Sequence, residues 1–304
     1  MEKHIEIRNA APELFIRAMF GGFTNQFGWL FFAFGMVFFW VFSSMVDFTD
    51  LIYFSGKLRN ATGQVIKVED TNAEVNDNTI QRITFSFTNP DNKSTKMAET
   101  QPGKNSNLIV SECYETGTSY KSGQSVQVEF PDKKPEIARI VGTRRGIFPY
   151  WVLFLVAIFP ALGIGFIFFG IRRGLLIKSL LDHSFLTQGV LAGKEPTNTR
   201  INKKPVMKLT FSFETRDGQP AYVVARTHDY KHLVDEAEEP LLYNPYNPKE
   251  SCLLDDIPGR PRLDEKGRLV PTEKETIAKT LLLPIIALIV NVLGVLLRFQ
   301  LMII

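Results

Sequence analysis

The stretch YWVLFLVAIFPALGIGFIFFG, residues 150–170, decides the class of fold because it contains no charged residue. It lies within an apolar block, residues 148–171, that meets the length of roughly 20 residues needed by a helix to cross the hydrocarbon core of a bilayer. Helices buried inside soluble proteins rarely run so far without a charge. The block therefore predicts a transmembrane helix.

Two further blocks meet the same test. Residues 27–47 contain GWLFFAFGMVFFWVFSSMV, and residues 280–297 contain LLLPIIALIVNVLGVLL. No A-x-A-like cleavage site follows the first block, so we expect an uncleaved anchor there and not a signal peptide. The sequence thus predicts three transmembrane helices.

The rest of the chain divides around these helices. Two long loops, residues 52–145 and 180–262, are expected to form separate domains. An N-terminal tail occupies residues 1–26, and a polar linker, residues 263–279, leads into the third helix. A single crossing at each block would place the two loops on opposite faces of the membrane. Pro160 and the glycines after it leave open a shallow re-entrant bend instead.

The two loops resemble each other in sequence. Each contains TFSF, at residues 84–87 and 210–213, and the same offset of 126 places Gly63 on Gly189. Alternation of apolar and polar residues around TFSF has the period of two that indicates a strand. Four to five short strands in each loop are enough for a small curled sheet or a partial barrel.

A second pair of matched blocks follows at a different offset. VEFPDKKPEIARI (128–140) parallels LLYNPYNPKESCL (241–253), with Pro135 on Pro248. The second copy is therefore 13 residues shorter between the two blocks, and we assign this difference to the connector that contains HDYKH, residues 228–232. Two matched blocks in the same order indicate duplication. The predicted fold class is a membrane α + β protein, with three transmembrane helices and two homologous small all-β domains.

The closing block carries a resemblance to a known family. Residues 243–259 read YNPYNPKESCLLDDIPG, and VEFPDKKPEIARIVG at residues 128–142 is similar in a degraded form. With the glycine-led strand and the TFSF strand, these blocks resemble a bacterial membrane-protein family built on a small β domain of unknown function carried between transmembrane helices. The resemblance covers most of the chain, although the first copy has an insertion and lacks the second Asn-Pro. It implies the fold and a multi-pass location in the bacterial inner membrane, and it implies no activity.

Charge and cysteine content restrict the function further. The chain has 35 Lys and Arg against 32 Asp and Glu, mixed along its length, so no nucleic-acid partner is expected. Lys and Arg are equally frequent near both sets of helix ends, so the positive-inside rule does not orient the chain. The short basic tail favours a cytoplasmic N-terminus. Cys113 and Cys252 lie in different loops, so we expect no disulfide between them, and they offer probes of the side that each loop faces.

HDYKH resembles the zinc-binding pattern H-E-x-x-H. On a helix, His228, His232 and Glu236 would share one face and form a candidate metal site. However, Asp229 is shorter than the glutamate that acts as the base in that pattern, and no third histidine follows. The alternative interpretation, a solvated polar connector, is favoured, and no cofactor is expected.

Two arginine pairs bracket the second predicted helix. Arg144 with Arg145, and Arg172 with Arg173, are placed to contact anionic lipid head groups, although ordinary anchoring at the interface is the favoured interpretation. Transporters usually place ionisable groups inside the membrane. The three blocks hold no charge in mid-span, and the polar Asn291 is more typical of a bond between helices.

These observations favour a protein that is not an enzyme. We expect an interaction or scaffold protein that presents its β domains at the surface of the lipid bilayer to an unknown protein partner or to further copies of itself. Exposed sheet edges would dock the partner by strand addition. Two alternatives stay open: a metal-dependent hydrolase that uses His228 and His232, and a subunit of a transport assembly.

Overall fold

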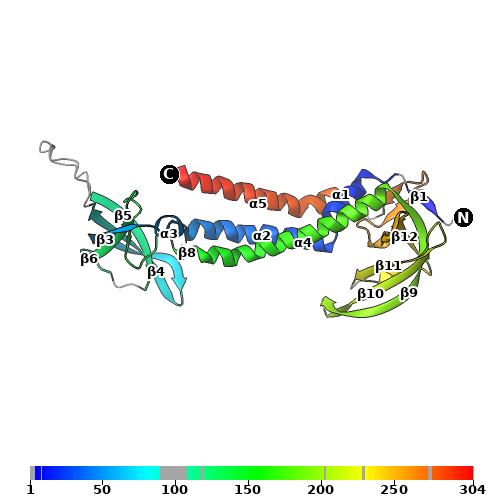
Figure 1. The fold of residues 1–304 in the computed structure, drawn as a ribbon, viewed down its shortest axis with the longest axis horizontal. Coiled ribbons are helices and arrows are strands. Elements are labelled where there is room, and N and C mark those ends of the chain that lie inside the picture. Colours follow the sequence, from blue (N-terminus) through cyan, green and yellow to red (C-terminus); the bar gives the residue numbers. More distant parts are fainter. Residues whose placement is uncertain are drawn as a thin grey trace. The chain divides into compact units, whose positions relative to one another are not determined.

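The chain folds into two compact units (Figure 1). Unit 1 comprises Met1–Val37 and Phe159–Ile304, and unit 2 comprises Phe38–Ile158. The structure is a computed structural model, and it describes residues 4–7, 9–89, 108–117, 120–201, 203–227, 230–272 and 276–303.

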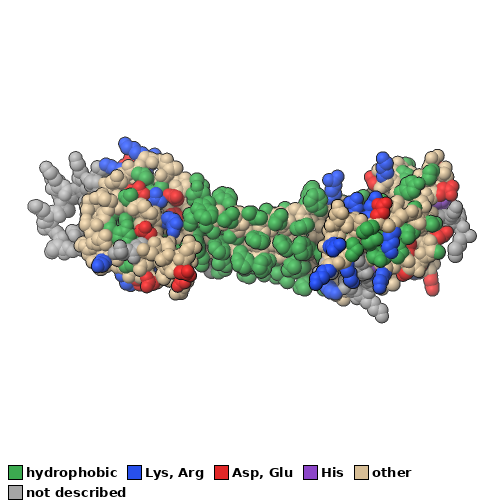
Figure 2. Space-filling model, turned by 90° about the horizontal axis from the view of Figure 1, so that it is seen from below, with side chains coloured by type: hydrophobic (Ala, Val, Ile, Leu, Met, Phe, Trp, Pro, Cys, Tyr) green, Lys and Arg blue, Asp and Glu red, His purple; other side chains and the backbone are tan. Residues whose placement is uncertain are grey.

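Three helices are long and apolar enough to cross a membrane, judged by length and composition. They are α2 (Phe23–Met45), α4 (Trp151–Asp182) and α5 (Ile277–Ile303). Figure 2 shows that hydrophobic side chains cover the visible surface of the helices. The three predicted apolar helices are therefore confirmed, and they indicate a membrane protein. α4 is one continuous helix with Pro160 inside it, so the re-entrant bend is not formed.

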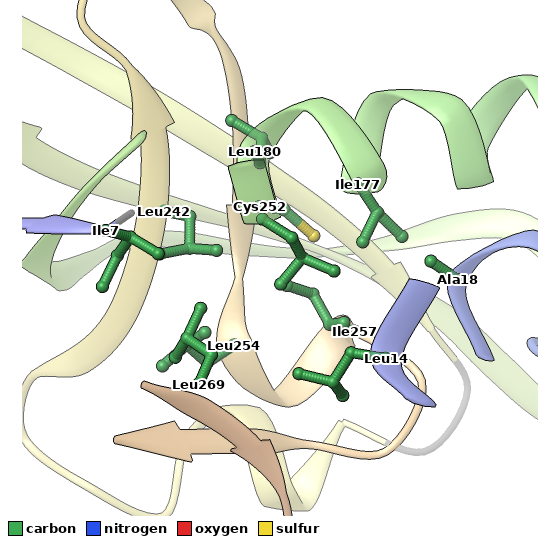
Figure 3. Close-up of a cluster of buried hydrophobic side chains, with 11 residues drawn as sticks. Ile7, Leu14, Ala18, Ile177, Leu180, Leu242, Cys252, Leu254, Ile257 and Leu269 are labelled. Atoms are coloured by element: carbon green, nitrogen blue, oxygen red, sulfur yellow. The ribbon is translucent and has the colours of Figure 1, made fainter. Parts of the chain in front are cut away.

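α4 extends well beyond its predicted end at residue 171. After Arg173 the helix becomes amphipathic, and Ile177, Leu180 and Leu181 are buried. Figure 3 shows Ile177 and Leu180 pointing into the same cluster as side chains from the β sheet of unit 1. The last turns of α4 thus belong to the core of unit 1, and the predicted domain start at residue 180 falls inside the helix.

The N-terminal segment, expected to be a tail, is part of unit 1. Ile5–Ile7 form β1, which pairs antiparallel with β9 (Ser184–Ile201). Pro12–Phe20 form α1, with proline in the first turn, where it costs no helical hydrogen bond. Leu14 and Ala18 of α1 are buried in the cluster of Figure 3. These contacts anchor the segment to the rest of unit 1.

Unit 2 contains a five-stranded antiparallel sheet. In spatial order its strands are β5 (Leu108–Thr116), β4 (Asn78–Thr88), β3 (Leu58–Val75), β6 (Ser125–Pro131) and β7 (Arg139–Ile140). The sheet curls until Tyr114 of β5 meets Arg144, just beyond β7, and their backbones exchange hydrogen bonds of 2.6 and 3.1 Å. Phe85, Phe87 and Phe130 form the centre of the enclosed core.

Asp47 holds together the residues of unit 2 that adjoin the two helices. It lies in β2 (Val46–Asp47), which pairs in parallel with β8 (Phe148–Pro149). The buried carboxylate accepts hydrogen bonds from the backbone N–H of Thr49 at 2.9 Å and of Arg145 at 2.8 Å. Because both N–H groups bond to the Asp47 carboxylate, the residues just after α2 are linked to the residues just before α4.

The main sheet of unit 1 has the same strand order as that of unit 2. Its strands are β11 (Pro220–Thr227), β10 (Lys204–Glu214), β9, β12 (Glu239–Asn244) and β13 (Asn247–Leu253), with β1 added beside β9. The sheet curls so that β11 and β13 approach each other, but the described strands do not close into a barrel. A small separate hairpin, β14 (Pro261–Leu263) and β15 (Leu269–Pro271), leads towards α5.

In the first hairpin of each sheet, the paired residues of unit 1 and unit 2 differ by a constant offset in number. Val65 pairs with Phe85 in unit 2, and Leu191 pairs with Phe211 in unit 1, an offset of 126 for both partners. A β-bulge interrupts both ladders directly after these pairs. The two hairpins therefore share register as well as order.

A pair of threonines repeats the same correspondence. The Thr71 hydroxyl donates to the carbonyl oxygen of Ile80 at 2.6 Å, and the Thr197 hydroxyl donates to that of Val206 at 2.8 Å. Each bond joins the two strands of its hairpin near the turn. The correspondence thus extends from the backbone to side-chain contacts.

The second copy is shorter than the first at the hairpin that follows TFSF. The expectation that placed this difference in the connector containing HDYKH is therefore wrong. Ser86 pairs with Val110 where Ser212 pairs with Tyr222, so the offset falls from 126 to 112 across that hairpin. At β6 and β12 the offset is 113. The connector that contains HDYKH is therefore slightly longer than its counterpart and not shorter.

α2 and α4 approach each other very closely inside unit 1. A Cβ built on Gly28 would lie 2.7 Å from the backbone nitrogen of Ile167, and one on Gly163 would lie 2.5 Å from that of Phe32. Distances this short mean that backbone packs on backbone, which is how small residues bring membrane helices together. A Cβ on Gly165, by contrast, would meet nothing within 4 Å.

Candidate functional site

A cleft of about 640 Å³ opens in unit 1 where the helices meet the sheet. It is bounded by the α1–α2 turn at Gly21, by α4 around Gly174, by β11 and by the start of α5. Five basic and two acidic residues line it: Arg17, Arg173, Arg226, Arg260 and Lys279, with Asp255 and Asp256. The sequence offered no local signal for this site, because its residues come from segments far apart along the chain.

The predicted metal-binding residues are only partly described. His228 lies outside the described residues. His232 lies in η1 (Lys231–Leu233), a single 3-10 turn, and it lines the cleft. Glu236 follows in a bend, where its backbone N–H donates to the Glu239 carboxylate at 3.2 Å. The described part of this connector is therefore not the α-helix that the metal site would require to align the three side chains, and the metal site stays a prediction.

A group of three carboxylates lies beside η1 instead. Oxygen atoms of Asp235, Glu239 and Asp255 all lie within 4.8 Å of one another, and Glu239 and Asp255 are buried. Burial raises the pKa of Glu239, and the nearby carboxylates act in the same direction. A guanidinium nitrogen of Arg262 lies 2.6 Å from Asp255 and supplies a compensating charge. This group therefore joins β12, the 3-10 turn η2 (Leu254–Asp256) and β14 within unit 1.

The arginines predicted at the ends of the second helix have different surroundings. Arg173 lines the cleft, and its Nη2 lies 2.6 Å from the Asp256 carboxylate. Arg172 is exposed. Arg144 and Arg145 make the backbone bonds to β5 and to Asp47 described above, and their side chains are partly buried. Of the four, Arg173 is the one that lines this cleft, while contact with lipid stays a prediction for all of them.

The YNPYNP motif forms the β12–β13 hairpin and places its two tyrosines in opposite environments. Tyr243 is fully buried, and its hydroxyl accepts a hydrogen bond of 2.8 Å from the backbone N–H of Arg216. Tyr246 is 96% exposed at the tip. The turn is held by Asn244, whose side-chain oxygen accepts a 3.0 Å bond from the Tyr246 N–H.

The two asparagine side chains of the motif converge on one carboxylate. The amide nitrogen of Asn244 donates to Glu250 at 2.9 Å, and that of Asn247 donates to the other oxygen of Glu250 at 3.0 Å. Both oxygens of Glu250 thus bridge the turn. The motif builds a braced hairpin tip that carries an exposed aromatic ring.

The two cysteines are buried in the cores of their own units, so they are poor probes of sidedness. Burial, with Asp256 nearby, raises the pKa of Cys252 to about 12. At pH 8 about one such thiol in 10⁴ is the reactive thiolate. We expect maleimide to leave Cys252 unmodified in the folded protein at pH 8, and to modify it rapidly in SDS, where its pKa returns to about 8.5.

Mass spectrometry of the labelled chain measures this difference. A Lys67→Cys variant, whose new thiol stands at an exposed position of unit 2, is the control and should react without denaturant. Reaction of Cys252 in the folded protein at the rate of the control would contradict the buried site.

No protein-family model, curated protein or solved structure matches this chain.

Proposed function

We propose that this chain is a non-enzymatic interaction protein of the membrane, and that the β12–β13 hairpin of unit 1 contacts its protein partner. The observation that carries this proposal is the 96% exposure of Tyr246 at a braced hairpin tip. Tyrosine is enriched among the residues that dominate protein interfaces. Its ring offers a large apolar area and its hydroxyl a hydrogen bond, with few torsions to immobilise.

The bracing of the turn supports the same role. The bonds of Asn244 and Asn247 to Glu250 hold the tip in one conformation before any partner arrives. A preorganised loop loses less conformational entropy on binding, so more of the contact energy appears as affinity. At the offset of 113 the counterpart of Tyr246 in unit 2 is Lys133, so the proposed contact is specific to unit 1.

We extend the proposal to the origin and placement of the two units. Their common strand order and register support duplication of one small β domain, as in the bacterial family that the sequence resembles, with the bacterial inner membrane as the location. The continuity of α4 supports a single crossing between the two sheets, which would leave them in different compartments. Because the native thiols are buried, cysteines placed at Lys67 and Tyr246 are the suitable probes of this topology.

Site-specific photo-crosslinking in cells tests the proposed contact. A photoreactive phenylalanine analogue at position 246 is expected to yield one discrete adduct, whose mass distinguishes a second copy of the chain from another protein. The matched control carries the analogue at Tyr222, which is 60% exposed on β11, and is expected to give no such adduct.

A second variant separates a specific contact from random capture. Asn244→Ala removes the acceptor for the Tyr246 N–H and one donor to Glu250, so it should reduce the adduct while unit 1 stays folded. Equal adduct yields at positions 246 and 222, or a yield that Asn244→Ala leaves unchanged, would rule out the hairpin as the contact point.

A further inference from the structure

The cleft of unit 1 lies at the ends of the apolar parts of three helices. α2 begins at Phe23, α5 begins at Ile277, and the apolar stretch of α4 ends at Arg172. Large apolar side chains are exposed on the helices close to these ends, including Phe23 at 67% and Leu282 at 53%. Lipid head groups lie where the hydrocarbon core ends. The cleft is therefore at the level of the head groups if these helices cross the bilayer.

The charge of the cleft is positive. Five basic residues line it against two acidic ones. Arg173 pairs with Asp256 and Arg262 with Asp255, each at 2.6 Å, and Arg17 pairs with Glu13 of its own helix, so that six cations stand against three carboxylates when these partners are counted. In Figure 2 blue Lys and Arg side chains gather in unit 1 at the end of the hydrophobic helical surface. The excess of positive charge favours an anion in this concave site.

The first turn of α2 adds hydrogen-bond donors to the same cleft. The N–H of Gln26 bonds to the carbonyl oxygen of Gly22 at 3.1 Å, which makes Gly22 the residue before the helix, with a φ of +77°. The next three N–H groups belong to Phe23, Thr24 and Asn25, which line the cleft. The opening N–H groups of a helix have no partner within the helix, and they carry its positive dipole end.

Side chains of this turn hold the cleft in shape. The side-chain amide of Asn25 donates to the carbonyl oxygen of Met19 at 2.9 Å. The side-chain amide of Gln26 donates to the carbonyl oxygen of Thr280 at 2.8 Å. These bonds join α1, α2 and α5 around the cleft.

We infer that this cleft binds the phosphate group of an anionic phospholipid, with the acyl chains lying along the exposed apolar faces of the helices. The cation excess, the donors of the α2 first turn and the position at the ends of the apolar segments together carry the assignment. It rests on the membrane location of the chain and is independent of the proposed contact at Tyr246. A failure at one site therefore leaves the other untouched.

The test compares two double variants of the full chain in nanodiscs of neutral phosphatidylcholine, titrated with phosphatidylglycerol. Arg226→Gln/Lys279→Gln removes two cations that line the cleft, and we expect the Kd for one phosphatidylglycerol to rise on the order of 100-fold, about tenfold for each charged hydrogen bond lost. Lys178→Gln/Lys249→Gln removes the same charge from exposed positions of unit 1 outside the cleft lining, and we expect a change of about fivefold or less because exposed charges are screened by solvent.

Native mass spectrometry of the detergent-extracted chain gives a second measurement. Wild type and the Lys178→Gln/Lys249→Gln control should retain one phosphatidylglycerol, and the cleft variant should retain none. Arg226→Gln alone, at an exposed position, serves if the double variant does not fold. Equal losses in both double variants, or retention of phosphatidylcholine as readily as phosphatidylglycerol, would overturn the site. Binding of inorganic phosphate without lipid, with the same dependence on Arg226, would overturn the assignment to a phospholipid and indicate a soluble phosphate.

Discussion

Gly163→Leu is expected to separate α2 from α4 and to destabilise unit 1 by about 3 kcal/mol or more, at the upper end of the overpacking range. A Cβ at this position would lie 2.5 Å from the nitrogen and 2.8 Å from the Cα of Phe32. Both are backbone atoms, so no rotamer change relieves the clash, and the helices must move apart. The loss of close packing removes the dispersion energy that holds membrane helices together. SDS titration of the protein in mixed micelles, followed by tryptophan fluorescence, measures the effect.

Gly165→Leu is the matched control for this prediction. It adds the same side chain to the same helix two residues away, where a Cβ would meet nothing within 4 Å. We expect wild-type stability or a small gain, because glycine is a poor helix former. Coincident unfolding curves for the two variants would show that α2 and α4 do not pack through Gly163.

Phe211→Ala is expected to cost unit 1 about 3–5 kcal/mol, the range for removing a large buried aromatic side chain. Phe211 is 1% exposed and lies on the interior strand β10, paired with Leu191 on one side and Val223 on the other. The folded state loses the transfer free energy of the removed ring, and the side chains around the cavity lose their van der Waals contacts with it. Hydrogen exchange of the β9, β10 and β11 amides should report the lower opening free energy directly.

Tyr222→Ala provides the control on the opposite face of the same sheet. Successive residues of a strand point to opposite faces, and Tyr222 is 60% exposed beside the buried Val223. We expect a change within about 0.5 kcal/mol, as for most exposed positions. A loss for Tyr222→Ala as large as that for Phe211→Ala would mean that both faces of the sheet are buried.

The elements predicted correctly from the sequence are those whose signal is local. An uninterrupted apolar run identifies a helix able to cross a bilayer, whatever surrounds it, and α2, α4 and α5 follow from that alone. The alternation in TFSF identifies β4 and β10 in the same way, because one face of each strand is buried. Within such elements, composition is sufficient.

Strand β5 has no clear local signal in the sequence because its pattern of burial is inverted. Leu108 and Val110 are exposed, at 53% and 56%, while Ser111 is buried at 6%. Burial of this serine is tolerated because its hydroxyl donates to the carbonyl oxygen of Ala138 at 3.1 Å, outside its own strand. Partners that stand far away in the chain, and not local hydrophobicity, thus determine which face points inwards. The same cause hid α1 and β1, whose buried faces are complementary to α4 and β9.

The candidate sites divide in the same way. The YNPYNP motif was visible as a motif, but only the hairpin shows that Tyr243 is a core residue while Tyr246 is exposed. HDYKH was visible as a pattern, but the described part of its connector is a 3-10 turn packed near η2 and not an α-helix. The sequence singled out Arg173 and His232, which line the cleft, but it did not indicate the cleft itself, because its cations come from α1, α4, β11, the segment after η2 and α5.

The sequence by itself determined that the chain has three helices apolar enough to span a membrane and strands built on TFSF, because these properties depend on neighbours within a few residues. Only the tertiary structure decided that the end of α4 and the N-terminal segment complete the core of unit 1, and that scattered basic residues surround one cleft. The reason is physical. Burial and charge at a site are sums over every segment that approaches it, and which segments approach is set by packing across the whole unit.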